Sequence, residues 1–201
     1  MQEQVPADGN FNSIFAAIAW LVYGALYLDG FWLVGCATGC VIMLIPILNE
    51  YRSGTVKIMD CTSLGYFALA AAISTTSAVH SLEKYHVVIV WGLFAIVGWA
   101  TLVAGFPFTI QYARERAPRE AWDSPLFAHI NTTLTIMWAI VFTFGAFLGV
   151  LIFAIGHAFL LGVAIPLSAM GIGYVFNNRY PKRFTDRFEL SAKSTTVATS
   201  R

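Results

Sequence analysis

Six long apolar stretches without a single charged residue constrain this chain more than any other feature. They cover approximately Phe11–Leu28, Phe31–Leu48, Thr62–Val79, Val87–Gln111, Ile130–Leu151 and Ile155–Phe176. A helix needs about 20 apolar residues to cross the hydrocarbon core of a bilayer, and each stretch comes within a few residues of that length. The sequence therefore predicts an all-α integral membrane protein with six transmembrane helices.

The composition agrees with a protein that lies almost wholly in the membrane. Only 11% of the residues are charged and 58% are hydrophobic, whereas soluble domains carry about 25% charged residues. A net charge of +1 gives no concentrated basic patch for nucleic acid. We expect the lipid bilayer as the main partner, with other membrane subunits or further copies of the chain, and a bacterial inner membrane as the location.

The basic residues predict how the chain is threaded. Of the twelve Lys and Arg residues, all except Lys84 fall in the segments 49–61, 112–129 and 179–201. Cytoplasmic loops retain Lys and Arg because basic segments are hard to translocate. These three segments should therefore be cytoplasmic, together with both termini, and Lys84 should lie on the outer side.

This threading groups the predicted helices into three tandem α-hairpins. We expect a short N-terminal segment (1–10), a membrane domain (11–178) with hairpins of about 11–61, 62–127 and 128–178, and a flexible, basic tail (179–201). Residues 1–10 contain no Lys or Arg, so the first apolar stretch is interpreted as a retained span and not as a cleaved signal peptide.

The cytoplasmic helix ends of the hairpins resemble one another. Each combines an amide with a tyrosine and, nearby, an arginine: Asn49, Tyr51 and Arg52; Gln111, Tyr112 and Arg114; Asn177, Arg179 and Tyr180. The amides stand 62 and then 66 residues apart, which suggests an internal repeat. The alternative is that any inner membrane boundary favours tyrosine and arginine.

Histidines gather at the predicted outer ends of the helices. His80, His86 and His157 fall there, with Asp29 and Glu83 in the adjoining turns. These side chains would suffice for a metal or a shallow haem. The alternative is that they are ordinary interfacial residues, since no local H-E-x-x-H spacing supports a site.

Polar residues, glycine pairs and prolines inside the predicted spans each have a structural and a functional interpretation. Two polar clusters either bridge helices by hydrogen bonds or line a polar path; they are Ser74, Thr75, Thr76 and Ser77 in the third predicted helix, and Asn131, Thr132, Thr133 and Thr135 in the fifth. Glycine pairs indicate close helix packing, within or between chains; they are Gly35 with Gly39 and Gly145 with Gly149. Prolines predict kinks or hinges at Pro46, Pro107 and Pro166.

The longest polar connection, 106–127, has no nucleophile and is interpreted as a boundary segment in which Glu115 can pair with Arg119.

The absence of ionisable residues from the six stretches argues against proton coupling through a buried carboxylate. We therefore expect a non-enzymatic accessory or structural subunit that packs with partner helices or lipids. The first alternative is a small-solute transporter or channel, and the second is a redox protein that binds metal or haem at the outer histidines.

Overall fold

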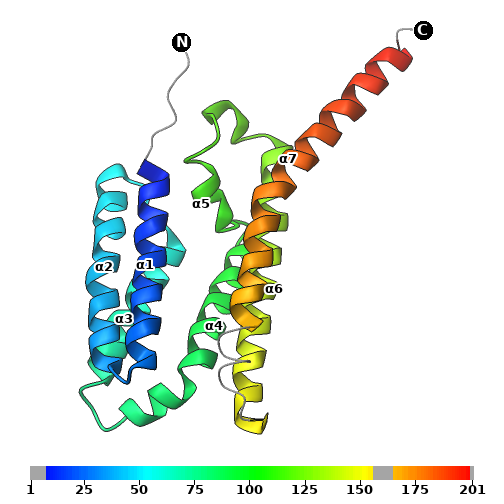
Figure 1. Cartoon of the computed structure of the whole chain (residues 1–201). Helices are drawn as coiled ribbons and strands as arrows, with labels where there is room; N and C mark the ends of the chain where they lie inside the picture. Colours follow the sequence, from blue (N-terminus) through cyan, green and yellow to red (C-terminus); the bar gives the residue numbers. More distant parts are fainter. Residues whose placement is uncertain (1–7, 156–164, 200–201) are drawn as a thin grey trace.

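The described part of the chain is entirely helical. The computed structural model describes residues 8–155 and 165–199, and no strand occurs within these ranges (Figure 1). The helices are α1 (Asp8–Leu28), α2 (Trp32–Ser53), α3 (Ile58–Ile73), α4 (Val79–Val103), α5 (Thr109–Ala113), the 3-10 turn η1 (Arg119–Ala121), α6 (Pro125–Ile155) and α7 (Ile165–Thr199). The predicted all-α class is confirmed for these residues.

Three of the described helices are long and apolar enough to cross a membrane. They contain the segments Trp32–Ser53 in α2, Glu83–Val103 in α4 and Pro125–Ile152 in α6. Two shorter apolar segments, Asn12–Leu28 and Ile58–Ile73, form most of α1 and all of α3. The last predicted span, Ile155–Phe176, lies partly outside the described residues. Membrane association is therefore supported, and the count of six spans stays a prediction.

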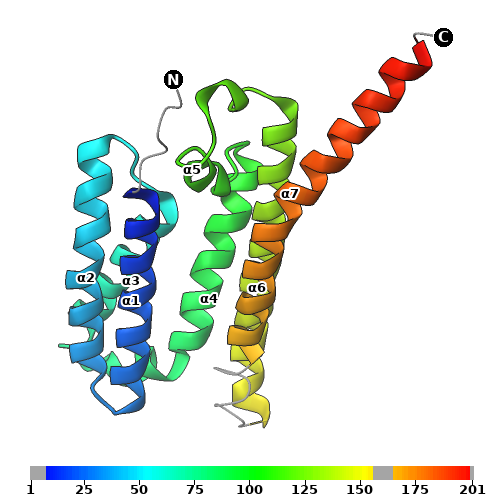
Figure 2. The same ribbon diagram turned by 45° about the horizontal axis from the view of Figure 1, so that its top comes forward.

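The long helices run alternately up and down and form two groups. One group is α1, α2 and α3, and the other is α4, α6 and α7 (Figures 1 and 2). Within the groups, α1 packs mainly against α2 and α4 mainly against α6, while α3 and α4 connect the two groups. The α2–α3 connection, α5 and the first turn of α6 share one end of the molecule, which we name the α5 end. The α1–α2 and α3–α4 turns share the opposite end.

The helix α3 ends earlier than the sequence suggested. After Ile73 the backbone bonds shorten to the i→i−3 type: the Thr75 N–H donates to the Ala72 carbonyl at 3.3 Å and the Thr76 N–H donates to the Ile73 carbonyl at 2.9 Å. The Ser74 and Thr76 hydroxyls add bonds to the Ala70 and Ile73 carbonyls in this tightened turn. Ser74–Ser77 therefore form part of the turn to α4 and do not extend the third helix, and α4 begins at Val79.

The other end of α4 also differs from the expected boundary. The helix stops at Val103, and Gly105 adopts a φ of +75°, in the left-handed region that glycine favours at helix ends. Pro107 lies in the connection to α5 and not inside a helix. By contrast, Pro46 lies within α2, and Pro166 is the second residue of α7, a position that tolerates proline.

An aromatic cluster forms the core of the first group. Tyr23, Tyr66 and Phe67 are buried between α1, α2 and α3, and Trp20 stacks on Tyr66 with ring centroids 5.6 Å apart. The hydroxyl groups of Tyr23 and Tyr66 hydrogen-bond to each other at 3.0 Å, and the Trp20 indole donates to Ser63 Oγ at 3.2 Å. The polar groups of these rings are thus paired, as burial requires.

Both predicted glycine motifs pack helices within the chain. A Cβ at Gly39 would lie 2.9 Å from the Phe67 ring, and a Cβ at Gly35 would lie 3.3 Å from the Tyr23 carbonyl oxygen. In α6, Gly145 lies directly against the Trp91 ring of α4. Gly149 packs likewise against Val88 of α4. Glycine at these four positions lets the neighbouring helices approach closely.

Candidate functional site

Three charged side chains are buried at the α5 end of the molecule: Glu50, Lys57 and Asp60. Together with the half-buried Tyr112 and Glu115, which contact them, they form what we call the charged cluster. Glu50 and Lys57 have no exposed surface, and Asp60 is only 5% exposed. Residues of these types are almost never fully buried unless they are paired, so their partners decide what the cluster can do.

The turn between α2 and α3 brings the first two members together. Gly54 has a φ of +71° and ends α2, which reverses the chain within a few residues. Glu50 then receives two hydrogen bonds from Lys57: the backbone N–H donates to Oε2 at 3.1 Å and Nζ donates to Oε1 at 2.8 Å. Both oxygens of the buried carboxylate therefore have a donor.

Lys57 also connects the α2–α3 turn to α5 and to the segment that follows it. Its Nζ lies 2.7 Å from Glu115 Oε1, and 5.2 Å from the centre of the Tyr112 ring. Burial would lower the pKa of Lys57, but the hydrogen bonds to Glu115 and Glu50 outweigh burial, and the pKa is raised. Lys57 is therefore charged at neutral pH and sits between two carboxylates. Glu115 makes this pair instead of the expected one with Arg119.

Asp60 is the least satisfied member of the charged cluster. The Tyr112 hydroxyl donates to Asp60 Oδ1 at 3.2 Å. No donor reaches Asp60 Oδ2 among the described residues. Burial, and then the charges of Asp60 and Glu50, raise the pKa of Tyr112 well above its usual range. Tyr112 therefore keeps its proton and acts as a donor to Asp60.

The helix α5 is held on both sides by further polar contacts. On the α3 side, the Ile58 backbone N–H donates to Gln111 Oε1 at 2.9 Å. On the α6 side, the Thr109 hydroxyl donates to the Asn131 carbonyl at 2.8 Å and lies 2.8 Å from Thr135 Oγ1. Asn131 and Thr135 are buried; the Thr135 hydroxyl and the Asn131 backbone carbonyl join α6 to α5 here, whereas the Asn131 side-chain amide donates within α6 to the Phe127 carbonyl at 2.8 Å. Thr132 and Thr133 are half-buried beside them on α6.

The three amides of the predicted repeat each bind the first helix of their own predicted hairpin. Asn49 Nδ2 of α2 donates to Asn12 Oδ1 of α1 at 3.4 Å. Gln111 accepts from the start of α3, as described above. Asn177 Oδ1 of α7 accepts from the Trp138 indole of α6 at 3.3 Å. The amides therefore share an interhelical role, although their donors and acceptors differ.

The tyrosines and arginines of those helix ends are mostly at the surface. Tyr51 and Arg52 are exposed. The Arg114 guanidinium lies over the Trp122 ring at 5.0 Å, and Tyr180 stacks on Phe176 with centroids 4.9 Å apart. Only Tyr112 enters the charged cluster, so the structure does not bring these repeated side chains to one place.

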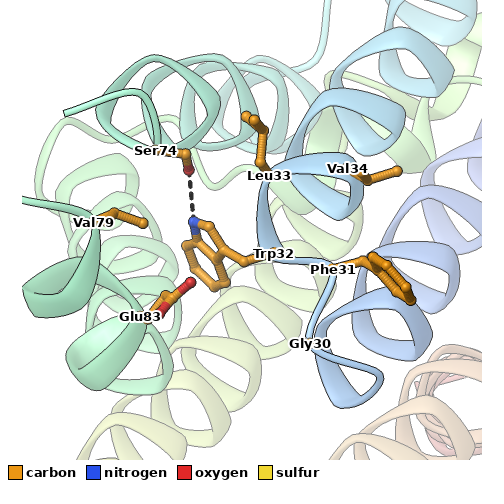
Figure 3. Close-up of a pocket in the computed structure, with 8 residues that line it drawn as sticks. All are labelled: Gly30, Phe31, Trp32, Leu33, Val34, Ser74, Val79 and Glu83. Carbon is orange, nitrogen blue, oxygen red and sulfur yellow. Dashed lines mark hydrogen bonds between the residues drawn. The ribbon is translucent and has the colours of Figure 1, made fainter.

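A shallow depression of about 310 Å³ opens at the opposite end of the molecule (Figure 3). Trp32 forms its wall, and the Trp32 indole donates to Ser74 Oγ at 2.7 Å. The Glu83 carboxylate lies beside the Trp32 ring (Figure 3). Thr75, Thr76 and Ser77 are exposed in the adjoining turn. This end is separated by the length of the bundle from the polar residues of α6 (Figures 1 and 2).

The predicted outer histidines are only partly brought together. The His86 ring is half-buried against Tyr27, with centroids 4.2 Å apart, and its Nδ1 lies 2.8 Å from the Glu83 carbonyl. His80 and Asp29 are exposed, and His157 lies outside the described residues. Within the described ranges, no three His, Cys, Asp or Glu side chains are placed to hold a metal ion. A metal or haem site that includes His157 stays a prediction.

Most of the charged cluster was missed by sequence reasoning. The segment 49–61, which contains Glu50, Lys57 and Asp60, was expected only to be a cytoplasmic connection, and Glu115 was expected to pair with Arg119. The available signal is that Glu50 follows an apolar stretch and precedes Lys57 by seven residues, with Gly54 between them. That pattern is typical of a tight turn that returns an opposite charge to a helix end.

Comparison with known protein families, with curated proteins and with solved structures gave no match. The fold and the site therefore define a class only, namely an all-helical protein whose apolar helices are compatible with a membrane and which buries a charged cluster at one end. Any function has to be argued from the described residues themselves.

Proposed function

We propose that this protein is a non-enzymatic structural subunit of a membrane assembly, which packs its own helices against those of a partner. The observation that carries the proposal is a face of α3 that the chain leaves open. Four small residues follow one another along this face and are all exposed; they are Cys61, Gly65, Ala68 and Ala72. Their spacing of four, three and four residues keeps them on one side of the helix.

A surface of small residues is suited to another helix more than to lipid. Small side chains let two helix backbones approach closely, and close packing drives association where lipid removes the hydrophobic contribution. In this chain Gly35, Gly39, Gly145 and Gly149 each meet a neighbouring helix. A Cβ at Gly65 would instead meet nothing within 4 Å, which leaves room for a helix from outside the chain.

The proposal includes six spans in three hairpins, with both termini in the cytoplasm of a bacterial cell. The alternating directions of α1, α2, α3, α4, α6 and α7 support this arrangement (Figure 1). The hydrogen bonds of the Asn49, Gln111 and Asn177 side-chain amides support the pairing of helices within hairpins. The cations near α5 support a cytoplasmic assignment for the α5 end.

The buried polar residues support a structural role more than a solute path. The Thr109 hydroxyl of α5 bonds to the Asn131 backbone carbonyl and to Thr135 Oγ1 of α6, which favours a bridge between helices over a polar path. The charged cluster connects the α2–α3 turn to the segment after α5 at the same end. Together these contacts fix the arrangement of the helices that a partner would recognise.

A pair of leucine substitutions tests the role of the open α3 face. Gly65→Leu fills that face, and Gly92→Leu is a matched control on α4, because neither glycine has a neighbour within 4 Å of an added Cβ. Each variant is extracted from native membranes with a lipid-retaining polymer, and the particle mass and tryptophan fluorescence are measured. Gly65→Leu should reduce the particle to a single chain with unchanged fluorescence, whereas Gly92→Leu should leave it intact. Equal masses for both variants would contradict the assignment of this face.

A further inference from the structure

A second depression adjoins the one drawn in Figure 3 and shares part of its lining. It has a volume of about 360 Å³ and is lined by Tyr27, Leu28, Gly30, Trp32 and Glu83. The last three of these residues line both depressions. Glu83 is the only charged side chain among the described residues that line them, so a single negative charge lies on their shared wall.

The Glu83 carboxylate has no counter-ion in the described part of the chain. No cationic side chain there forms an ion pair with it. The neighbouring cation, Lys84, lies over the Tyr85 ring at 5.4 Å. Glu83 is half-buried, and a carboxylate that has lost part of its hydration is stabilised by a cation. The charge of this wall therefore suits a cation from outside the chain.

Trp32 forms a fixed aromatic wall beside this carboxylate (Figure 3). Its indole donates to Ser74 Oγ at 2.7 Å, and its ring packs against the rings of His86 and Tyr27, with centroids 5.5 and 5.6 Å away. Aromatic rings attract organic ammonium ions, whereas Ca²⁺ and Mg²⁺ need several oxygen ligands. One carboxylate next to an aromatic wall therefore favours an organic ammonium group over a metal ion.

The depth of the depressions in a membrane follows from the helices that form them. The apolar segments Trp32–Ser53 and Glu83–Val103 are long enough to cross a membrane, and both begin at residues that line the depressions. The depressions therefore lie where the helices leave the hydrocarbon core, at the level of the lipid headgroups. From this level Leu33 and Val34, which also line the first depression, expose 45% and 50% of their surface.

We propose that this end of the molecule binds the ammonium headgroup of a membrane phospholipid. The ammonium group pairs with the Glu83 carboxylate beside Trp32, and an acyl chain lies against Leu33 and Val34. A phospholipid supplies both the cation and the apolar chain that this lining accommodates, whereas a free amine supplies the cation alone. The inference goes beyond the proposed subunit function and does not depend on the open face of α3.

The experiment offers the delipidated full chain an equal mixture of phosphatidylethanolamine and phosphatidylglycerol with identical acyl chains, and native mass spectrometry counts the bound lipids. The wild type should retain more phosphatidylethanolamine, and Glu83→Gln should lower the ratio by about two- to fivefold, as for a partly exposed ion pair. Asp29→Asn alters an exposed acid that lines neither depression and should keep the wild-type ratio. Equal retention of both lipids by the wild type, or an unchanged ratio in Glu83→Gln, would overturn the proposal.

A measurement on the wild type alone decides the matter if Glu83→Gln does not fold. N-acetylated phosphatidylethanolamine keeps the acyl chains but has no positive charge on nitrogen, so the wild type should retain it about two- to fivefold less than the parent lipid. Equal retention of the two forms would overturn the role of the ammonium group. Displacement of the lipid by an equal concentration of ethylammonium ions, which lack a long chain, would overturn the choice of a phospholipid.

Discussion

Replacement of Lys57 by methionine removes the positive charge that the described structure places against Glu50. Methionine retains most of the apolar volume, so the main loss is electrostatic. Glu50 would be left with no exposed surface and no counter-charge. Removing one partner of a buried ion pair costs about 3–5 kcal/mol, because an uncompensated charge remains in the interior. The contact with Glu115, whose side chain is 19% exposed, adds at most about 1 kcal/mol.

This cost should be visible in thermal unfolding of the purified protein in lipid discs. For a chain of this size, 1 kcal/mol shifts the midpoint by about 2–4 °C, so Lys57→Met should unfold about 6–20 °C below the wild type. Lys84→Met, at an exposed position on α4, provides the matched control and should change the midpoint by no more than a few degrees.

A double variant isolates the pairwise contribution. When Glu50→Gln is combined with Lys57→Met, the buried carboxylate is removed together with its partner. The double variant should then be more stable than the sum of the single effects, by an interaction energy of about 1–3 kcal/mol. If Lys57→Met unfolds at the same temperature as Lys84→Met, or if the single effects add, the buried pair does not stabilise the fold.

Two further predictions concern packing and threading. Gly145→Ala should destabilise the protein by about 1–3 kcal/mol, because its Cβ would overlap the Trp91 ring; Gly92→Ala, with open space, should be neutral or slightly stabilising in the same unfolding assay. For threading, a single cysteine at Lys84 should react with an impermeant thiol reagent in intact cells, whereas one at Glu120 should react only after permeabilisation. The reverse pattern would invert the proposed orientation.

The apolar stretches predicted where the helices of this chain lie, but they predicted less well where each helix begins and ends. In a chain this uniformly apolar, hydrophobic periodicity does not mark where a helix stops. At the end of α3 the backbone changes to i→i−3 hydrogen bonds at Thr75 and Thr76. The end of α4 is set by Gly105 and its left-handed backbone. These local interactions compete with the hydrophobic length argument and override it.

The candidate site was harder to predict because burial was judged from the apolar stretches alone. Glu50 and Asp60 lie just outside those stretches, so their burial was not expected. Glu50 has no exposed surface and belongs to α2, an apolar helix long enough to span a membrane. The second carboxylate that pairs with Lys57, that of Glu115, is 65 residues from Glu50 in the sequence. Only the folded position of the segment after α5 reveals the ion pair between Lys57 and Glu115.

The measurement that tests the central claim most directly is the number of chains in one particle of the wild-type protein, taken from its native membrane with the surrounding lipid retained. Mass measurement of such particles at native expression should show this chain together with at least one more membrane-spanning chain, as the open face of α3 predicts. Particles that contain one copy of this chain and lipid alone would contradict the structural-subunit account.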